Sequence, residues 1–192
     1  MFIKRTFDIV FSFIGLLLLS PVFLGILLII RFRVPGPVIF RQKRAGRYGK
    51  PFTIYKFRTM TADHGGGSVT VKGEGRITPL GAVLREYKLD ELPELWNVLK
   101  GDMSFVGPRP DMLEYVEKLK GEEQKILELR PGITGPATLK YASEEELLAT
   151  VPDPVKYNDE VLWPDKVRMN LKYYDNRSFW RDIWIVWKTV FR

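Results

Sequence analysis

The sequence predicts an α+β fold that is mostly helical and has one membrane-associated segment. Three observations support this prediction: an uncharged N-terminal run of 22 residues, one pair of strand-like segments, and later segments with helix start and stop signals. The length of 192 residues fits one domain, 1–192. A chain of this length can bury a core without disulfide bonds, and this one contains no cysteine.

The uncharged run covers Ile9–Ile30. About 20 apolar residues suffice for a helix to span a bilayer. Ser20-Pro21 lies in the middle of the run, where proline removes a backbone hydrogen bond and predicts a kink. Basic residues flank the run on both sides: Lys4 and Arg5 before it, Arg31 and Arg33 after it. Because positive residues prefer the cytoplasmic side, residues 1–33 form either a kinked spanning helix or a re-entrant helix; both alternatives stay open here.

The charge is unevenly distributed along the chain. The net charge is +7, but residues 1–61 carry eleven Lys and Arg against Asp8 alone, so this third is +10 and the rest is −3. A basic segment indicates an anionic partner, which can be nucleic acid, a lipid headgroup or a phosphorylated substrate. No recognised nucleic-acid motif is present, so we expect no nucleic-acid partner.

The globular part, residues 34–178, begins with a predicted β-hairpin of Val38–Gln42 and Phe52–Phe57 around a glycine-containing turn. A polar, glycine-rich loop is expected over 61–75. Helices are expected over 79–88, 93–100, 111–120, 122–129 and 164–175, and one opens at a capping box beginning with Ser143.

The last segment, 179–192, is predicted to be a helix with Trp180, Trp184 and Trp187 on one face. One alternative is that this aromatic face packs against the protein core, as it does in many helices. Three tryptophans flanked by basic residues also suit a helix lying in a membrane interface, which is the interpretation favoured here.

The composition limits the catalytic groups and metal ligands that the chain can use. With no cysteine and a single histidine, His64, thiol catalysis and multi-histidine metal sites are excluded. Asp90 and Glu91 lie just before the helix expected at Pro93. Adjacent carboxylates bind Mg²⁺, and an aspartate can act as a nucleophile towards phosphorus. The alternative is that Asp90 only caps the helix.

Two rigid turns present arginines: Gly107-Pro108-Arg109-Pro110 and Arg130-Pro131-Gly132. A guanidinium held by such a backbone suits bidentate phosphate binding. The alternative is two structural turns with surface arginines. Together with the acidic pair and the apolar run, these turns indicate Mg²⁺-dependent chemistry on a phosphorylated substrate at a membrane.

The stretch LDELPELWNVLKGDMSFVGPRP, residues 89–110, closely resembles the bacterial sugar transferase family, the monotopic polyprenyl-phosphate phosphoglycosyl transferases. Matching motifs occur in the family's order at 4–8, 20–21, 55–60 and 130–135, and the length matches the family's minimal form. The resemblance implies a compact, largely helical cytosolic domain with in-plane amphipathic helices. It also implies that residues 1–33 form a re-entrant membrane helix kinked at Ser20-Pro21, and that 179–192 form an interfacial helix.

The resemblance further implies a reaction. Such enzymes transfer a phospho-sugar from a nucleotide diphosphate sugar, usually a UDP-sugar, to undecaprenyl phosphate, the first membrane step of glycoconjugate assembly. By this resemblance Asp90 is the nucleophile that forms an aspartyl-phosphosugar intermediate, Glu91 completes the acidic dyad, and both hold Mg²⁺. Substrate-binding residues are expected at family positions that bind phosphate or nucleotide: Lys56, Arg85, Arg109 and Arg130.

The expected location is the cytosolic face of the bacterial inner membrane, in contact with membrane lipids. The sugar, the pathway, the role of residues 136–163 and the oligomeric state stay open, with a homodimer as one option. Many relatives continue Leu-Ala-Gln after the Arg-Pro-Gly motif, whereas this chain continues Pro136-Ala137-Thr138. The competing function is a non-catalytic membrane-bound scaffold that binds anionic lipids through the basic third.

Overall fold

A computed structural model describes residues 2–61 and 75–191. Residues 62–74, which include His64 and most of the expected glycine-rich loop, lie outside the described residues. The described chain is α+β and mostly helical, as predicted. The helices are α1 Phe2–Leu18, α2 Ser20–Arg33, α3 Pro79–Glu86, α4 Glu94–Lys100, α5 Leu113–Val116, α6 Pro136–Lys140, α7 Glu144–Ala149, α8 Pro154–Tyr157, α9 Trp163–Asp175 and α10 Phe179–Val190.

The N-terminal apolar run forms two helices, α1 and α2, which meet at an angle of 59°. The predicted kink is therefore confirmed, and the hydrogen bonding at Ser20 and Pro21 explains it. Pro21 has no N–H to donate to the carbonyl of Leu17 one turn earlier, and the hydroxyl of Ser20 donates to that carbonyl instead, at 2.7 Å. Among the described residues no single helix is long and apolar enough to cross a bilayer; α1 and α2 meet that standard only together.

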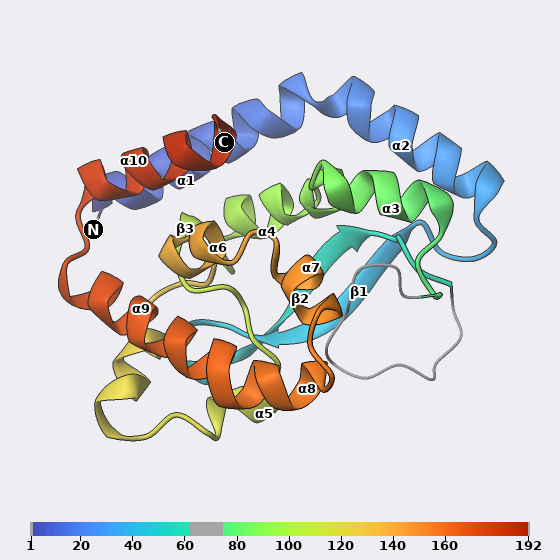
Figure 1. Cartoon of the computed structure of the whole chain (residues 1–192). Helices are drawn as coiled ribbons and strands as arrows, with labels where there is room; N and C mark the ends of the chain where they lie inside the picture. The colour runs from blue at the N-terminus through green and yellow to red at the C-terminus, as the bar shows by residue number, and fades with distance from the viewer. Residues whose placement is uncertain (1, 62–74, 192) are drawn as a thin grey trace.

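The predicted hairpin is also confirmed. Strands β1 (Ile39–Ala45) and β2 (Pro51–Phe57) pair antiparallel, with Ile39 opposite Phe57 and Ala45 opposite Pro51. The hairpin lies between the layer formed by α1 to α4 and helix α9, which runs along the opposite side of the molecule (Figure 1).

A second, parallel sheet was not predicted from the sequence. Strands β3 (Ser104–Val106) and β4 (Gly132–Thr134) pair with Ser104 opposite Gly132 and Val106 opposite Thr134. This pairing brings the two arginine-bearing turns together. The N–H of Gly107 donates to the carbonyl of Thr134 at 2.9 Å, and the N–H of Gly132 donates to that of Pro108 at 2.7 Å.

Several predicted helices differ from those observed. Only Leu113–Val116 of 111–120 is α-helical, and 122–129 is instead a 3-10 helix, η3 (Gly121–Glu128). The helix predicted to open at Ser143 is observed as α7, but the capping box itself is not formed. The hydroxyl of Ser143 makes no capping bond, because the N–H of Glu146, the donor that such a cap uses, donates instead to the backbone carbonyl of Ser143 at 3.1 Å.

Charged side chains of α1 fasten it to the globular part. Lys4 Nζ donates to the carbonyl of Val106 at 2.8 Å and contacts Asp182 Oδ2 of α10 at 2.5 Å. The carboxylate of Asp8, 2% exposed, accepts from Ser104 Oγ and from the N–H of Phe105, both at 3.1 Å. The helix therefore keeps its polar groups paired while its other face remains apolar.

The helices α1 and α2 carry many exposed apolar side chains. On α1 and α2 they are Phe2, Ile3, Ile9, Val10, Phe11, Phe13, Ile14, Leu17, Leu18, Val22, Leu24, Leu27, Leu28, Ile29 and Phe32. Helix α10 lies beside α1 (Figure 1), with the rings of Phe7 and Phe179 5.7 Å apart. Trp180, Trp184 and Trp187 are 79%, 55% and 53% exposed, so the alternative of a core-packed tryptophan face is wrong.

This exposure leads to a prediction about tryptophan fluorescence. Replacing Trp180, Trp184 and Trp187 together by Phe should remove most fluorescence quenching by lipids brominated near the headgroup, because interfacial rings sit at that depth. The measurement is emission in vesicles with and without brominated lipid. Trp96 and Trp163, kept in the variant, provide the residual signal, and circular dichroism checks the fold. Quenching equal to that of the wild type would contradict an interfacial α10.

Candidate active site

A large cavity with a volume of about 1830 Å³ lies in the described part of the molecule. Part of its wall is apolar and comes from α1, α4 and α10: Phe7, Phe11, Gly15, Leu95, Val186 and Val190. Another part is charged: Lys56, Arg85, Asp90, Glu91, Arg109 and Glu145. The cavity thus offers both a surface for an apolar chain and a cluster of groups for phosphate chemistry.

The turn between α3 and α4 positions Asp90. Helix α3 starts at an N-cap, Thr78, whose hydroxyl accepts from the N–H of Gly81 at 2.9 Å. After α3, Lys88 adopts a left-handed backbone with φ 54°. Left-handed backbone is uncommon for a residue with a Cβ. The 3-10 turn η2 (Leu89–Glu91) follows and turns the Asp90 side chain into the cavity wall.

Asp90 is buried, with 6% of its surface exposed, and its Oδ1 atom has no hydrogen-bond partner. The alternative that Asp90 merely caps the next helix is wrong. Helix α4 begins after Pro93, and no side chain caps it. Burial, followed by the charge of Glu91, raises the pKa of Asp90, whereas Lys56 and Arg85 lower it. A buried carboxylate oxygen without a partner is costly, so this atom is available to a ligand.

Glu91 is paired with two cations through one of its carboxylate oxygens. Its Oε1 accepts from Lys56 Nζ at 2.6 Å and from Arg109 Nη2 at 2.8 Å. Burial alone would raise the pKa of Glu91, but the charges of Arg109 and Lys56 hold it well below its ordinary value. Lys56 also contacts Glu94 Oε1 at 3.2 Å, and burial raises the pKa of Glu94 to about 7.

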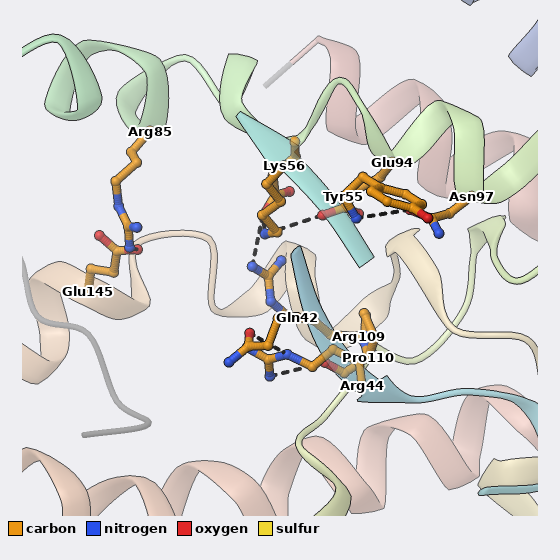
Figure 2. A network of polar contacts seen from close by, with 11 residues as sticks. Gln42, Arg44, Tyr55, Lys56, Arg85, Glu94, Asn97, Arg109, Pro110 and Glu145 are labelled. Carbon is orange, nitrogen blue, oxygen red and sulfur yellow. Dashed lines mark hydrogen bonds and ion pairs between the residues drawn. The ribbon is translucent and has the colours of Figure 1, made fainter. Parts of the chain in front are cut away.

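Arg85 also faces the cavity, but it pairs with a different carboxylate. Its Nη2 donates to Glu145 of α7, while its Nε is buried and has no partner. Figure 2 shows Arg85 and Glu145 pointing toward each other, at some remove from Lys56 and Arg109.

The structure therefore brings together Asp90, Glu91, Lys56, Arg85 and Arg109 on one cavity wall. It places Arg130 elsewhere: this residue does not line the cavity, and its Nε donates to the carbonyl of Gly101 at 2.9 Å. The two arginine-bearing turns share a backbone ladder, yet only Arg109 faces the acidic pair. A substrate-binding role for Arg130 stays a prediction.

No group of three or more His, Cys, Asp or Glu residues that could hold a metal occurs within 2–61 and 75–191. Magnesium does not need one, because it is commonly held by one or two carboxylates, waters and the substrate's phosphates. The partnerless Oδ1 of Asp90 fits that role. Glu91 fits less well, since one of its oxygens already accepts from two cations.

Sequence reasoning missed Glu94 and Glu145. Glu94 follows Asp90 by four positions and Glu91 by three, a spacing that brings helical side chains to one face. That spacing was the available signal. Glu145 had none, because it lies 60 residues from Arg85 and only the fold brings them together.

Comparison with known proteins identifies the family of this chain. The profile of the bacterial sugar transferase family matches residues 1–192. The chain belongs to the bacterial sugar transferase family. It is 36% identical over 190 residues to a Bacillus subtilis protein named uncharacterized sugar transferase EpsL, covering 99% of this chain and 86% of that one.

Two similar sugar transferases carry more specific names. One, from Aeromonas hydrophila, is a UDP-N-acetylgalactosamine-undecaprenyl-phosphate N-acetylgalactosaminephosphotransferase, 36% identical over 98% of this chain and 43% of its own length. Another, from Escherichia coli, is a UDP-glucose:undecaprenyl-phosphate glucose-1-phosphate transferase, 38% identical over 99% of this chain and 40% of its own length. The chain therefore spans less than half of these two relatives.

Proposed function

We propose that this chain transfers a phospho-sugar from a nucleotide diphosphate sugar, most suitably a UDP-sugar, to undecaprenyl phosphate. The observation that carries the proposal is Asp90, which has a buried, partnerless carboxylate oxygen in the wall of the large cavity. The names of the relatives support the two substrate classes.

In the proposed first step, a carboxylate oxygen of Asp90 attacks the sugar-bearing phosphorus of the donor. The bond between that phosphorus and the oxygen bridging the two phosphates breaks, so the nucleoside monophosphate leaves with the bridging oxygen. Asp90 must be ionised to attack, and its pKa is raised by burial. Lys56 and Arg85 favour the ionised form, and they are also suited to hold the phosphates.

In the second step, a phosphate oxygen of undecaprenyl phosphate attacks the same phosphorus. The bond from Asp90 to phosphorus breaks, and polyprenyl-diphosphate-sugar leaves while the carboxylate is restored. The mechanism is therefore ping-pong. Arg109 and Lys56 keep Glu91 ionised, so Glu91 fixes these two cations beside the reacting carboxylate.

We include Mg²⁺ in the proposal, held by Asp90 with Glu91 as the second carboxylate. When bound, the ion would neutralise charge on the diphosphate and on the leaving phosphate. The apolar part of the wall, next to α1, suits the polyprenyl chain of the acceptor.

The proposal places the chain on the cytosolic face of the bacterial inner membrane, with α1 and α2 as a re-entrant pair. Single cysteines at Lys4 and Lys50, labelled from outside spheroplasts and then from the cytosolic side of inverted vesicles, should both react only on the cytosolic side. Lys4 precedes the apolar run and Lys50 lies after it, in the turn of the hairpin. The native chain without cysteine provides the blank. Labelling on opposite sides would overturn the re-entrant topology.

The decisive assay uses a panel of UDP-sugars with undecaprenyl phosphate, with and without Mg²⁺. We expect UMP release that requires the ion and one preferred sugar. A non-catalytic lipid-binding scaffold would bind anionic vesicles and release no UMP from any member of the panel.

A further inference from the structure

The acidic helix α7 lies in the stretch 136–163, to which sequence reasoning gave no role. Glu145 of this helix lines the cavity and pairs with Arg85 of α3. Two other contacts hold α7 in place. Glu144 Oε1 pairs with Lys166 Nζ at 2.6 Å, and Leu148 is 2% exposed. The helix is therefore anchored through its neighbours, and Glu145 is not needed to fix it.

The contact satisfies Arg85 only partly. Glu145 accepts from Nη2 of Arg85, but Nε of Arg85 is buried and has no partner. A guanidinium presents its Nε and Nη2 donors as a fork that matches two oxygens of one anion. The donor's diphosphate has two non-bridging oxygens on each phosphate and carries one more negative charge than a carboxylate. It can therefore engage both donors, and it would stabilise this guanidinium better than Glu145 does.

The side chains leave room for the exchange. Glu145 is 34% exposed and Arg85 is 19% exposed. A displaced Glu145 carboxylate therefore has direct access to water, so its release does not leave a buried charge behind. The exchange replaces a partly exposed ion pair by a phosphate contact within the cavity.

We propose that Glu145 is an internal competitor for the donor's phosphate: it occupies Arg85 in the free protein and is displaced when the diphosphate binds. The inference rests on the proposed function, because it assumes a diphosphate donor in this cavity. Glu145 is thus a specificity-determining residue. It selects against weakly charged ligands, because their contact with Arg85 stabilises the complex less than the ion pair with Glu145 stabilises the free protein.

The test is titration calorimetry of the full chain in detergent, with UDP and Mg²⁺ as the probe. Glu145→Gln should bind UDP about two- to tenfold more tightly than the wild type, the range expected for losing a partly exposed competing pair. Glu122→Gln is the matched control, since it removes the same charge from a side chain that is 75% exposed and outside the cavity. It should leave the affinity unchanged.

A double-mutant cycle shows whether Glu145 acts through Arg85. Glu145→Gln should have no effect on UDP affinity in an Arg85→Gln background. An equal gain in both backgrounds, or no gain in the wild-type background, would overturn the competitor role while leaving the proposed function standing. Failure of the wild type to bind UDP at all would instead count against the proposed function.

Discussion

Asp90→Asn is expected to abolish phosphosugar transfer, with a fall in kcat of at least about 10³-fold. The amide keeps the shape of the carboxylate but is a poor nucleophile, so no covalent intermediate should form. Two measurements check this: UMP release, and transfer of radioactivity from donor labelled in the sugar onto the protein. The fold should be retained, since Oδ1 of Asp90 makes no hydrogen bond that the change could remove.

Asp175→Asn is the matched control, because Asp175 is exposed and does not line the cavity. It should show wild-type turnover and labelling. Covalent labelling of the Asp90→Asn variant at the wild-type level would exclude Asp90 as the nucleophile. Lost turnover with normal labelling would place its role in the second step.

Gly107→Ala is expected to lower stability by roughly 3 kcal/mol, which corresponds to a fall in Tm of about 6–12 °C for a chain of this size. A Cβ at this position would lie 2.2 Å from the carbonyl oxygen of Arg130. Neither backbone can yield easily, because the ladder hydrogen bonds of β3 and β4 tie the two turns together. Thermal unfolding in detergent, followed by circular dichroism, measures the effect.

Gly25→Ala serves as the comparison, because a Cβ there meets no atom within 4 Å. Its Tm should stay the same or rise slightly, since alanine is the better helix former. An equally small effect at Gly107 would mean that the two turns are not held as closely as described. Activity should fall with stability in the Gly107 variant, because the close approach of the two turns at Gly107 holds Arg109 beside Glu91.

Local signals in the sequence predicted local structure well. The hairpin followed from two β-rich segments around a glycine-containing turn, and α4 ends where Gly101 takes φ 101°. The kink at Ser20-Pro21 followed from proline chemistry alone. In each case the residues that decide the structure lie within a few positions of one another.

What the sequence could not predict depends on contacts between distant segments. The strands β3 and β4 have three residues each, too few for a period-2 pattern. The pair of Arg85 and Glu145, and the different directions of Arg109 and Arg130, are likewise products of tertiary packing. The capping box at Ser143 failed for a local reason instead, because backbone carbonyls of neighbouring residues accept from N–H groups of the first turn.

The contact between Lys4 and Asp182 has a consequence for biosynthesis. These residues are 178 positions apart, so the ammonium of Lys4 must wait for almost the whole polypeptide to be made before its carboxylate partner leaves the ribosome. In the proposed arrangement at the membrane, helix α1 meets lipid long before it meets α10. The link between α1 and α10 is therefore a late, non-local step, of the kind that slows folding. The contacts of Asp8 with Ser104 and Phe105 can form earlier, so a chain stalled before residue 182 should already hold α1 against β3 but not against α10.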